Sequence, residues 1–125
     1  MPEPTNPVRD TWAERSGPAV FTTVDRDGTP NTIYVTCLAL YDDRTVLIAD
    51  NYFDKTRRNI LDGSTGALLY ITEDSKTVQI KGSLTYDTDG PLFDHMKTWN
   101  PTKHPGNAAV ALTIEEVYRG AERLL

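Results

Sequence analysis

Runs of apolar and β-branched residues recur along the chain and are separated by short polar turns. The turns at residues 26–28 and 74–76 contain Asp with Gly or Ser, which suits hairpin connections. Such alternation is typical of antiparallel strands joined by hairpins. The pattern predicts six strands, at residues 19–25, 32–41, 45–49, 65–73, 77–86 and 108–118.

The second predicted strand, residues 32–41, carries apolar side chains on both of its alternating faces. A strand of this kind suits a barrel wall with another element packed outside it. Cys37 lies within this run, so we expect a buried, inert thiol. Gly82, inside the fifth predicted strand, indicates a β-bulge or a close backbone approach.

Three short helices are predicted between the strands, at residues 11–15, 55–62 and 92–99. Asp54 is the expected N-cap of the second helix and Gly63 its expected C′ residue. Few helices and six closely spaced strands favour a mainly β fold, a closed antiparallel barrel. Residues 1–16 are expected to form an N-terminal arm with a short helix, and residues 17–125 a single barrel domain.

Charge and composition narrow the class of protein. The 125 residues carry a formal net charge of -5, which argues against nucleic acid as a partner. No apolar run is long enough to span a bilayer, so no membrane partner is expected. A single cysteine excludes an internal disulfide framework, and the N-terminus lacks the pattern of a secretory signal. We therefore expect a cytoplasmic protein.

The stretch from Val46 to Ile60 concentrates cations within this acidic chain. An apolar run leads through a polar corner into a predicted helix start that contains Lys55, Thr56, Arg57 and Arg58. Helix starts bind anions, and Lys and Thr add a charge and a hydroxyl donor, which together suit a phosphate group. A solvated, charged helix face explains the same residues without a ligand. Arg57 and Arg58 point to different sides of a helix, so at most one of them is expected to reach the ligand.

Several short motifs, taken in order, resemble those of the FMN-binding split-barrel family related to pyridoxamine 5′-phosphate oxidase, and the small single-domain FMN-binding proteins most of all. The resemblance implies a six-stranded antiparallel split β-barrel of Greek-key type, which forms a homodimer with FMN at the subunit interface. It runs from about Gly17 to Leu125. The motifs are Asn31-Thr32, Ala49-Asp50-Asn51, Lys55-Thr56 with Asn59, Ile80-Lys81-Gly82-Ser83, and the closing segment from Glu115 to Ala121.

The resemblance also implies the residues that would hold the cofactor. Lys55, Thr56 and Thr32, with Asn31 beside them, match the phosphate-binding positions of the family. The flavin ring matches the exit of the third predicted strand, at Ile48, Ala49, Asp50 and Asn51, where backbone groups of the strand end are expected to pair with its polar edge. Lys81 and Leu125 match positions that the partner subunit contributes near the ring.

The function implied is that of a small homodimeric flavoprotein, which passes electrons or acts as an FMN-dependent oxidoreductase with an unidentified redox partner. Full-length oxidases of the family carry a histidine-containing substrate motif near the C-terminus. This chain ends without one, so pyridoxamine phosphate oxidation is not expected. The alternatives are a non-catalytic barrel for another phosphate-bearing cofactor, such as a deazaflavin or pyridoxal phosphate, and an interaction module without a cofactor. The spacings predict no metal site and identify no catalytic residue.

Overall fold

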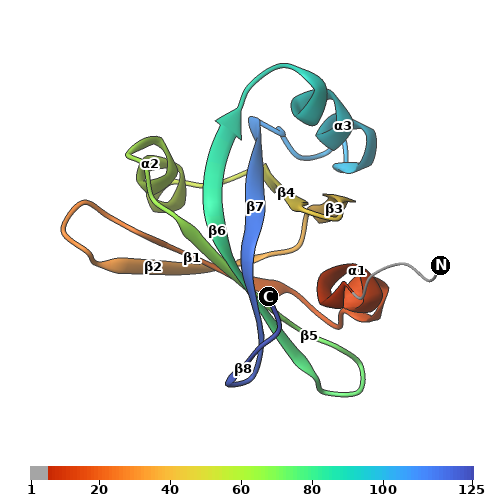
Figure 1. Ribbon diagram of the computed structural model, residues 1–125. Coiled ribbons are helices and arrows are strands. Elements are labelled where there is room, and N and C mark those ends of the chain that lie inside the picture. The colour runs from red at the N-terminus through yellow and green to blue at the C-terminus, as the bar shows by residue number, and fades with distance from the viewer. Residues whose placement is uncertain (1–5) are drawn as a thin grey trace.

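The computed structural model describes residues 6–125 and is mainly β, as predicted (Figure 1). Seven strands form one continuous antiparallel sheet, an eighth short strand pairs beside it, and three α-helices and a 3-10 helix join them. The elements are α1 (Pro7–Thr11), η1 (Trp12–Glu14), β1 (Ala19–Val24), β2 (Pro30–Val35), β3 (Leu38–Asp42), β4 (Thr45–Asp50), α2 (Lys55–Leu61), β5 (Gly66–Ile71), β6 (Thr77–Asp87), α3 (Pro91–Trp99), β7 (Ala108–Arg119) and β8 (Glu122–Arg123).

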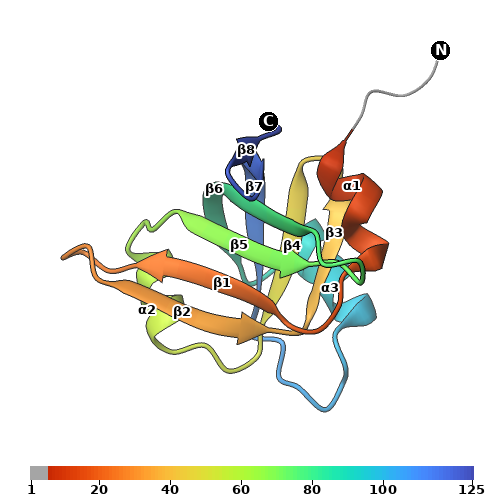
Figure 2. The same ribbon diagram turned by 90° about the horizontal axis from the view of Figure 1, so that it is seen from below.

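The order of the strands explains why the barrel is split. The sheet runs β2-β1-β5-β6-β7-β4-β3, so β2 and β3 are its two edges. Only Thr36 and Cys37 connect these two edge strands. Because two residues span only a few ångströms, the sheet must curl until its edges meet, as Figures 1 and 2 show. The edges join through this link without pairing along their length.

One strand was predicted where the structure has two. The predicted strand at residues 32–41 is divided into β2, which pairs with β1, and β3, which pairs with β4. The chain changes partner at Thr36 and Cys37, so a continuous apolar run conceals a bend. Cys37 is therefore a partly exposed residue of the link, not a buried strand residue, which corrects the expectation of a buried thiol.

The strands β4 and β7, rather than β2, are packed against other residues on both faces. Val46 and Ile48 of β4 enter the main core inside the curl, together with Phe21, Leu68 and Leu112. Ala49 faces a smaller cluster formed with Met96 of α3 and Ala109 of β7. Small alanines let α3 lie close against the outer face, where Figure 1 shows it beside β4 and β7. This packing fixes the end of β4, from which the chain turns toward α2.

Gly82 is confirmed as both a bulge and a close approach. The register between β6 and β7 shifts at Lys81 and Gly82. A Cβ atom at position 82 would lie 1.6 Å from the carbonyl oxygen of Thr113, so no larger residue fits without moving the neighbouring strand. The bulge bends the long strand β6 and contributes to the curl of the sheet.

The N-terminal helix begins earlier than predicted. Asn6 caps α1, because its side-chain oxygen accepts hydrogen bonds from the N–H groups of Val8 and Arg9, and Pro7 occupies the first turn. Val8 is buried in the core, and the ring of Trp12 meets that of Tyr70 edge-on. Residues 1–5 of the expected arm lie outside the described part of the chain. Among the described helices, none has the length and apolar character needed to cross a membrane.

The remaining predicted elements agree closely with the structure. Asp54 precedes α2 and pairs with Arg58 at 3.5 Å, although its side chain does not cap the helix. Gly63 ends the helix with a φ of 96°. At the C-terminus, Leu124 packs on the core and Leu125 remains exposed, while the carbonyl of Leu125 accepts a hydrogen bond from the N–H of Val117.

Candidate functional site

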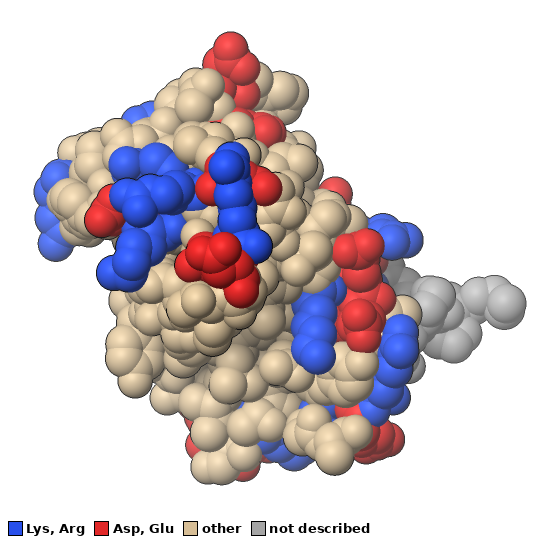
Figure 3. Space-filling view, turned by 90° about the vertical axis from the view of Figure 1, so that its left-hand side faces the viewer, with Lys and Arg blue, Asp and Glu red and all other residues tan. Residues whose placement is uncertain are grey.

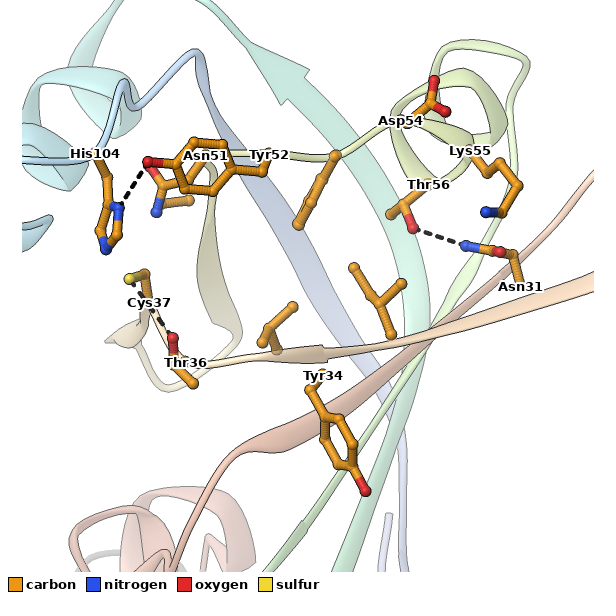
Figure 4. A pocket seen from close by; sticks show the side chains of 14 residues that line it. Asn31, Tyr34, Thr36, Cys37, Asn51, Tyr52, Asp54, Lys55, Thr56 and His104 are labelled. Atoms are coloured by element: carbon orange, nitrogen blue, oxygen red, sulfur yellow. Dashed lines mark hydrogen bonds between the residues drawn. The ribbon is translucent and has the colours of Figure 1, made fainter.

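A cavity of about 360 Å³ opens at the split between the sheet edges (Figure 4). Its size lies within the range of small-molecule sites. One wall comes from β2 and the link to β3, and the other comes from the end of β4 and the start of α2. A loop that precedes β7 contributes His104. The lining residues are Asn31, Ile33, Tyr34, Val35, Thr36, Cys37, Ala49, Asn51, Tyr52, Phe53, Asp54, Lys55, Thr56 and His104.

At one end of this cavity three polar side chains converge from two elements. The side-chain amide of Asn31 on β2 donates a 3.0 Å hydrogen bond to the hydroxyl of Thr56 on α2. Thr56 is only 2% exposed, and its hydroxyl keeps its own proton for a further partner. Lys55 lies beside it with an exposed side chain. We call Asn31, Lys55 and Thr56 the anion end, because they present donors and a positive charge.

The helix α2 is held in place by Asp50, whose side chain is fully buried. Its carboxylate accepts hydrogen bonds from Arg57 Nε at 2.7 Å, from the Tyr86 hydroxyl at 2.6 Å and from the Phe53 N–H at 2.9 Å. The same carboxylate raises the pKa of Arg57, chiefly through these hydrogen bonds. Burial, followed by the hydrogen bond to Asp50, raises the pKa of Tyr86. Asp50 thus ties β4, α2 and β6 together beneath the cavity.

Asn51 ties the same corner to the loop at residues 100–107. The side-chain amides of Asn51 and Asn100 hydrogen-bond to each other in both directions, at 2.9 and 3.1 Å. The Asn51 side-chain oxygen also accepts from the N–H of Gly106. Asn107 donates from its backbone to the Asp50 carbonyl and from its side chain to the Asn51 carbonyl. The side chain of Asn51 and the carbonyls of Asp50 and Asn51 are therefore engaged with the loop.

The other end of the cavity contains residues that the sequence did not indicate as a site. The hydroxyl of Tyr52 lies 3.1 Å from Nδ1 of His104, and their rings meet at 87°. Cys37 and Thr36 face them across the cavity (Figure 4). Tyr52 and His104 are 52 positions apart in the chain, so no local spacing signals the pair. We call Thr36, Cys37, Tyr52 and His104 the ring end, after the side-chain rings of Tyr52 and His104.

The predicted site residues divide between this cavity and other places. Asn31, Ala49, Asn51, Lys55 and Thr56 line it. The others lie elsewhere: Thr32 bonds to the Thr22 hydroxyl at the exposed surface, Ile48 is in the core, Asp50 is buried beneath the cavity, Lys81 lies over the Tyr118 ring, and Leu125 is exposed at the C-terminus.

Neither arginine of the basic stretch lines this cavity. Arg57 is engaged by Asp50 and Tyr86, and Arg58 pairs with Asp54. Figure 3 shows Lys and Arg side chains gathered on the face that carries α2, with acidic side chains between them. Arg26 and Asp62 form one such mixed pair at 2.8 Å. The positive charge of this region is thus largely balanced, and Lys55 supplies the charge at the anion end.

No cluster of three or more His, Cys, Asp or Glu side chains suited to a metal ion occurs within residues 6–125. In the turn at residues 26–28, the Asp25 carboxylate accepts from the N–H groups of Asp27 and Thr29, which closes the β1–β2 hairpin. The Asp25 carboxylate therefore serves the local backbone.

A curled antiparallel sheet that opens at its split defines a split-barrel protein, and the donor-lined cavity there is its candidate site. The family model described as pyridoxamine 5′-phosphate oxidase matches residues 7–119, and the chain belongs to this family. An uncharacterized protein of Methanocaldococcus jannaschii, MJ0282, is 31% identical in an alignment of 102 residues that covers 77% of this chain and 68% of that protein.

Two solved structures with the same fold are HupZ and an FMN-binding protein. HupZ from Group A Streptococcus has a TM-score of 0.79 at 22% identity, with 94% of each chain covered. An FMN-binding protein from Syntrophomonas wolfei has a TM-score of 0.71 at 21% identity, covering 89% of this chain and 79% of that chain. At these identities the likeness establishes the fold and leaves the ligand to be argued from the cavity.

Proposed function

We propose that this protein is a small flavoprotein that binds FMN in the cavity at the split and serves in electron transfer or as a flavin-dependent oxidoreductase. The observation that carries the proposal is the anion end, where Asn31, Lys55 and Thr56 converge at one end of a cavity of about 360 Å³. An ammonium, a hydroxyl and an amide suit a phosphate monoester. Membership of the family and the FMN-binding protein of the same fold support this choice of ligand.

The chemistry of the residues that line the cavity supports this cofactor. The anion end would hold the phosphate, and the partly apolar walls formed by Ile33, Ala49 and Phe53 would hold the ring. Bound FMN supplies one- or two-electron chemistry, while the protein orients the ring and sets its potential. The Asp50 and Asn51 contacts hold the wall formed by β4 and α2 and the loop that carries His104, which lowers the cost of ordering the site on binding.

We further propose that two copies of the chain form a dimer through the outer face of β2, β1 and β5. Tyr34, Val20 and Leu69 lie in register across these three strands. Tyr34 is 75% exposed and Leu69 is 40% exposed, and the Tyr34 ring points away from the cavity (Figure 4). A row of exposed apolar side chains on a sheet face favours burial against a partner, and a two-fold axis would bury the same row on both copies.

The visible spectrum of the purified protein, with and without added FMN, tests the cofactor directly. We expect flavin absorption bands and quenched flavin fluorescence on binding. Lys55→Ala should weaken FMN binding by about ten- to a hundredfold, since a charge-assisted hydrogen bond contributes roughly 1.5–3 kcal/mol. The control is Lys76→Ala, which removes an exposed lysine paired with Asp74 in the turn after β5 and should leave the affinity unchanged.

Riboflavin, which lacks the phosphate, separates the two ends of the cavity. Lys55→Ala should leave riboflavin binding unchanged. Failure of the wild-type protein to bind FMN would overturn the proposed function. In that event, binding of a deazaflavin cofactor or pyridoxal phosphate would identify another phosphate-bearing ligand, and binding of none of them would favour an interaction module. Rapid reduction by nicotinamide nucleotides would distinguish a reductase from an electron carrier.

A further inference from the structure

Hydrogen bonds hold the ring end of the cavity in a fixed position. His104 lies on the loop at residues 100–107, which Asn51 holds through Asn100 and Gly106. Lys97 adds a 3.0 Å hydrogen bond to the carbonyl of Pro105, the residue after His104. Gly106 has a φ of 54°, which permits the tight return of the loop into β7. The imidazole is thus presented to the cavity from a loop fixed on both sides.

Donor groups at the neighbouring strand end already have partners within the chain. The Ala49 N–H donates to the Cys37 carbonyl, and the Phe53 N–H donates to the Asp50 carboxylate. The side-chain amide of Asn51 donates to Asn100. A flat ring with carbonyl oxygens along its edge needs donors when it is buried, because an unpaired polar atom is costly. These three donors are not free for a ligand, and His104 at the other end of the cavity is a further donor that lines it.

We propose that His104 donates a hydrogen bond from Nε2 to the carbonyl edge of the flavin ring, with Tyr52 as the positioning residue that orients the imidazole. This inference rests on the proposed function. The proposal requires the Tyr52 hydroxyl to donate to Nδ1, 3.1 Å away, which leaves the ring proton on Nε2. Figure 4 shows this second nitrogen on the side away from Tyr52, toward Cys37 and Thr36. The flavin therefore spans the cavity, with its phosphate at the anion end and its carbonyl edge at the ring end.

A hydrogen-bond donor at this edge affects the reduction potential of the flavin ring as well as its binding affinity. Reduction places negative charge on the polar edge of a flavin, and a hydrogen bond stabilises that charge more than it stabilises the oxidised ring. His104 therefore raises the reduction potential of the bound cofactor.

The test compares FMN and riboflavin binding in matched histidine variants. His104→Phe should weaken both ligands by the same factor, about two- to tenfold, and lower the flavin potential. His104→Gln, which keeps an N–H donor, should restore much of both properties, and Tyr52→Phe should produce a smaller loss in each. His95→Phe is the control, since His95 on α3 also meets a tyrosine ring edge-on, Tyr41 at 5.0 Å, outside the cavity.

The outcomes separate this inference from the proposed function. If wild-type protein binds both flavins and His104→Phe changes neither their affinity nor the potential, the inference is overturned and the proposed function stands. If His104→Phe weakens FMN but not riboflavin, His104 acts on the phosphate and the inference is also overturned. If wild-type protein binds neither flavin, both fail together.

Discussion

Replacement of Asp50 by alanine should destabilise the fold strongly, because this buried carboxylate joins three elements of the structure. The substitution leaves three donors, on Phe53, Arg57 and Tyr86, without their acceptor. Breaking a buried ion pair by removing one partner costs about 3–5 kcal/mol. The Arg57 side chain is 36% exposed and can regain water, so we expect about 3 kcal/mol.

Urea denaturation at equilibrium, followed by tryptophan fluorescence, measures this loss. For a domain of this size, about 3 kcal/mol corresponds to a fall of roughly 10 °C in the melting temperature. Asp54→Ala is the matched control, because Asp54 forms an exposed pair with Arg58 one turn apart, and such pairs contribute roughly 0.3–0.5 kcal/mol. If Asp50→Ala and Asp54→Ala lower the free energy of unfolding equally, the assignment of Asp50 as the tie beneath the cavity is wrong.

Packing, burial and surface exposure lead to three more expected outcomes. Gly82→Ala should lower the free energy of unfolding, measured by denaturation, by about 3 kcal/mol or more, because its Cβ would meet the Thr113 carbonyl. The control Gly120→Asn, at a φ of 59° with no atom within 4 Å, should change stability little. Equal losses in the two variants would contradict the close approach at Gly82. Burial raises the pKa of Tyr70, so the unfolded chain releases this proton at a lower pH than the folded chain does. The free energy of unfolding should therefore fall as pH rises through about 10. Tyr70→Phe should flatten that fall, and an unchanged slope in this variant would refute the role of Tyr70. Tyr34→Lys should convert the proposed dimer to a monomer by light scattering, and a monomeric wild-type protein would refute the interface.

The cavity residues that the sequence indicates most directly belong to one continuous segment. Lys55 and Thr56 were identified because a strand exit, a corner and a helix start follow one another in the sequence, and the structure places both in the cavity. Asn31 and Thr32 were both predicted to contact the phosphate, yet only Asn31 lines the cavity, because adjacent residues of a strand face opposite sides. Burial and side-chain direction decide such choices, and a sequence pattern at the edge of a sheet does not reveal them.

Asp50 and Asn51 show a different limit of the sequence. They resembled ordinary corner residues with backbone contacts to a ligand, whereas in the structure their side chains hold α2 on one side and the loop at residues 100–107 on the other. Their partners, Arg57, Tyr86 and Asn100, lie 7, 36 and 49 positions away. A side chain that bonds over such separations gives no local signal of its role.

The sequence by itself determined most of the elements and the family. Hairpin turns, apolar runs and the boundaries of α2 are local features, because φ, ψ and side-chain periodicity act over a few residues. Tertiary structure alone decided that β2 and β3 are separate edges, that the cavity opens where they meet, and that Tyr52 and His104 form a pair there. These features arise when the sheet curls and brings distant residues together. The free energy of that closure comes from packing throughout the core, so no single segment of the sequence predicts it.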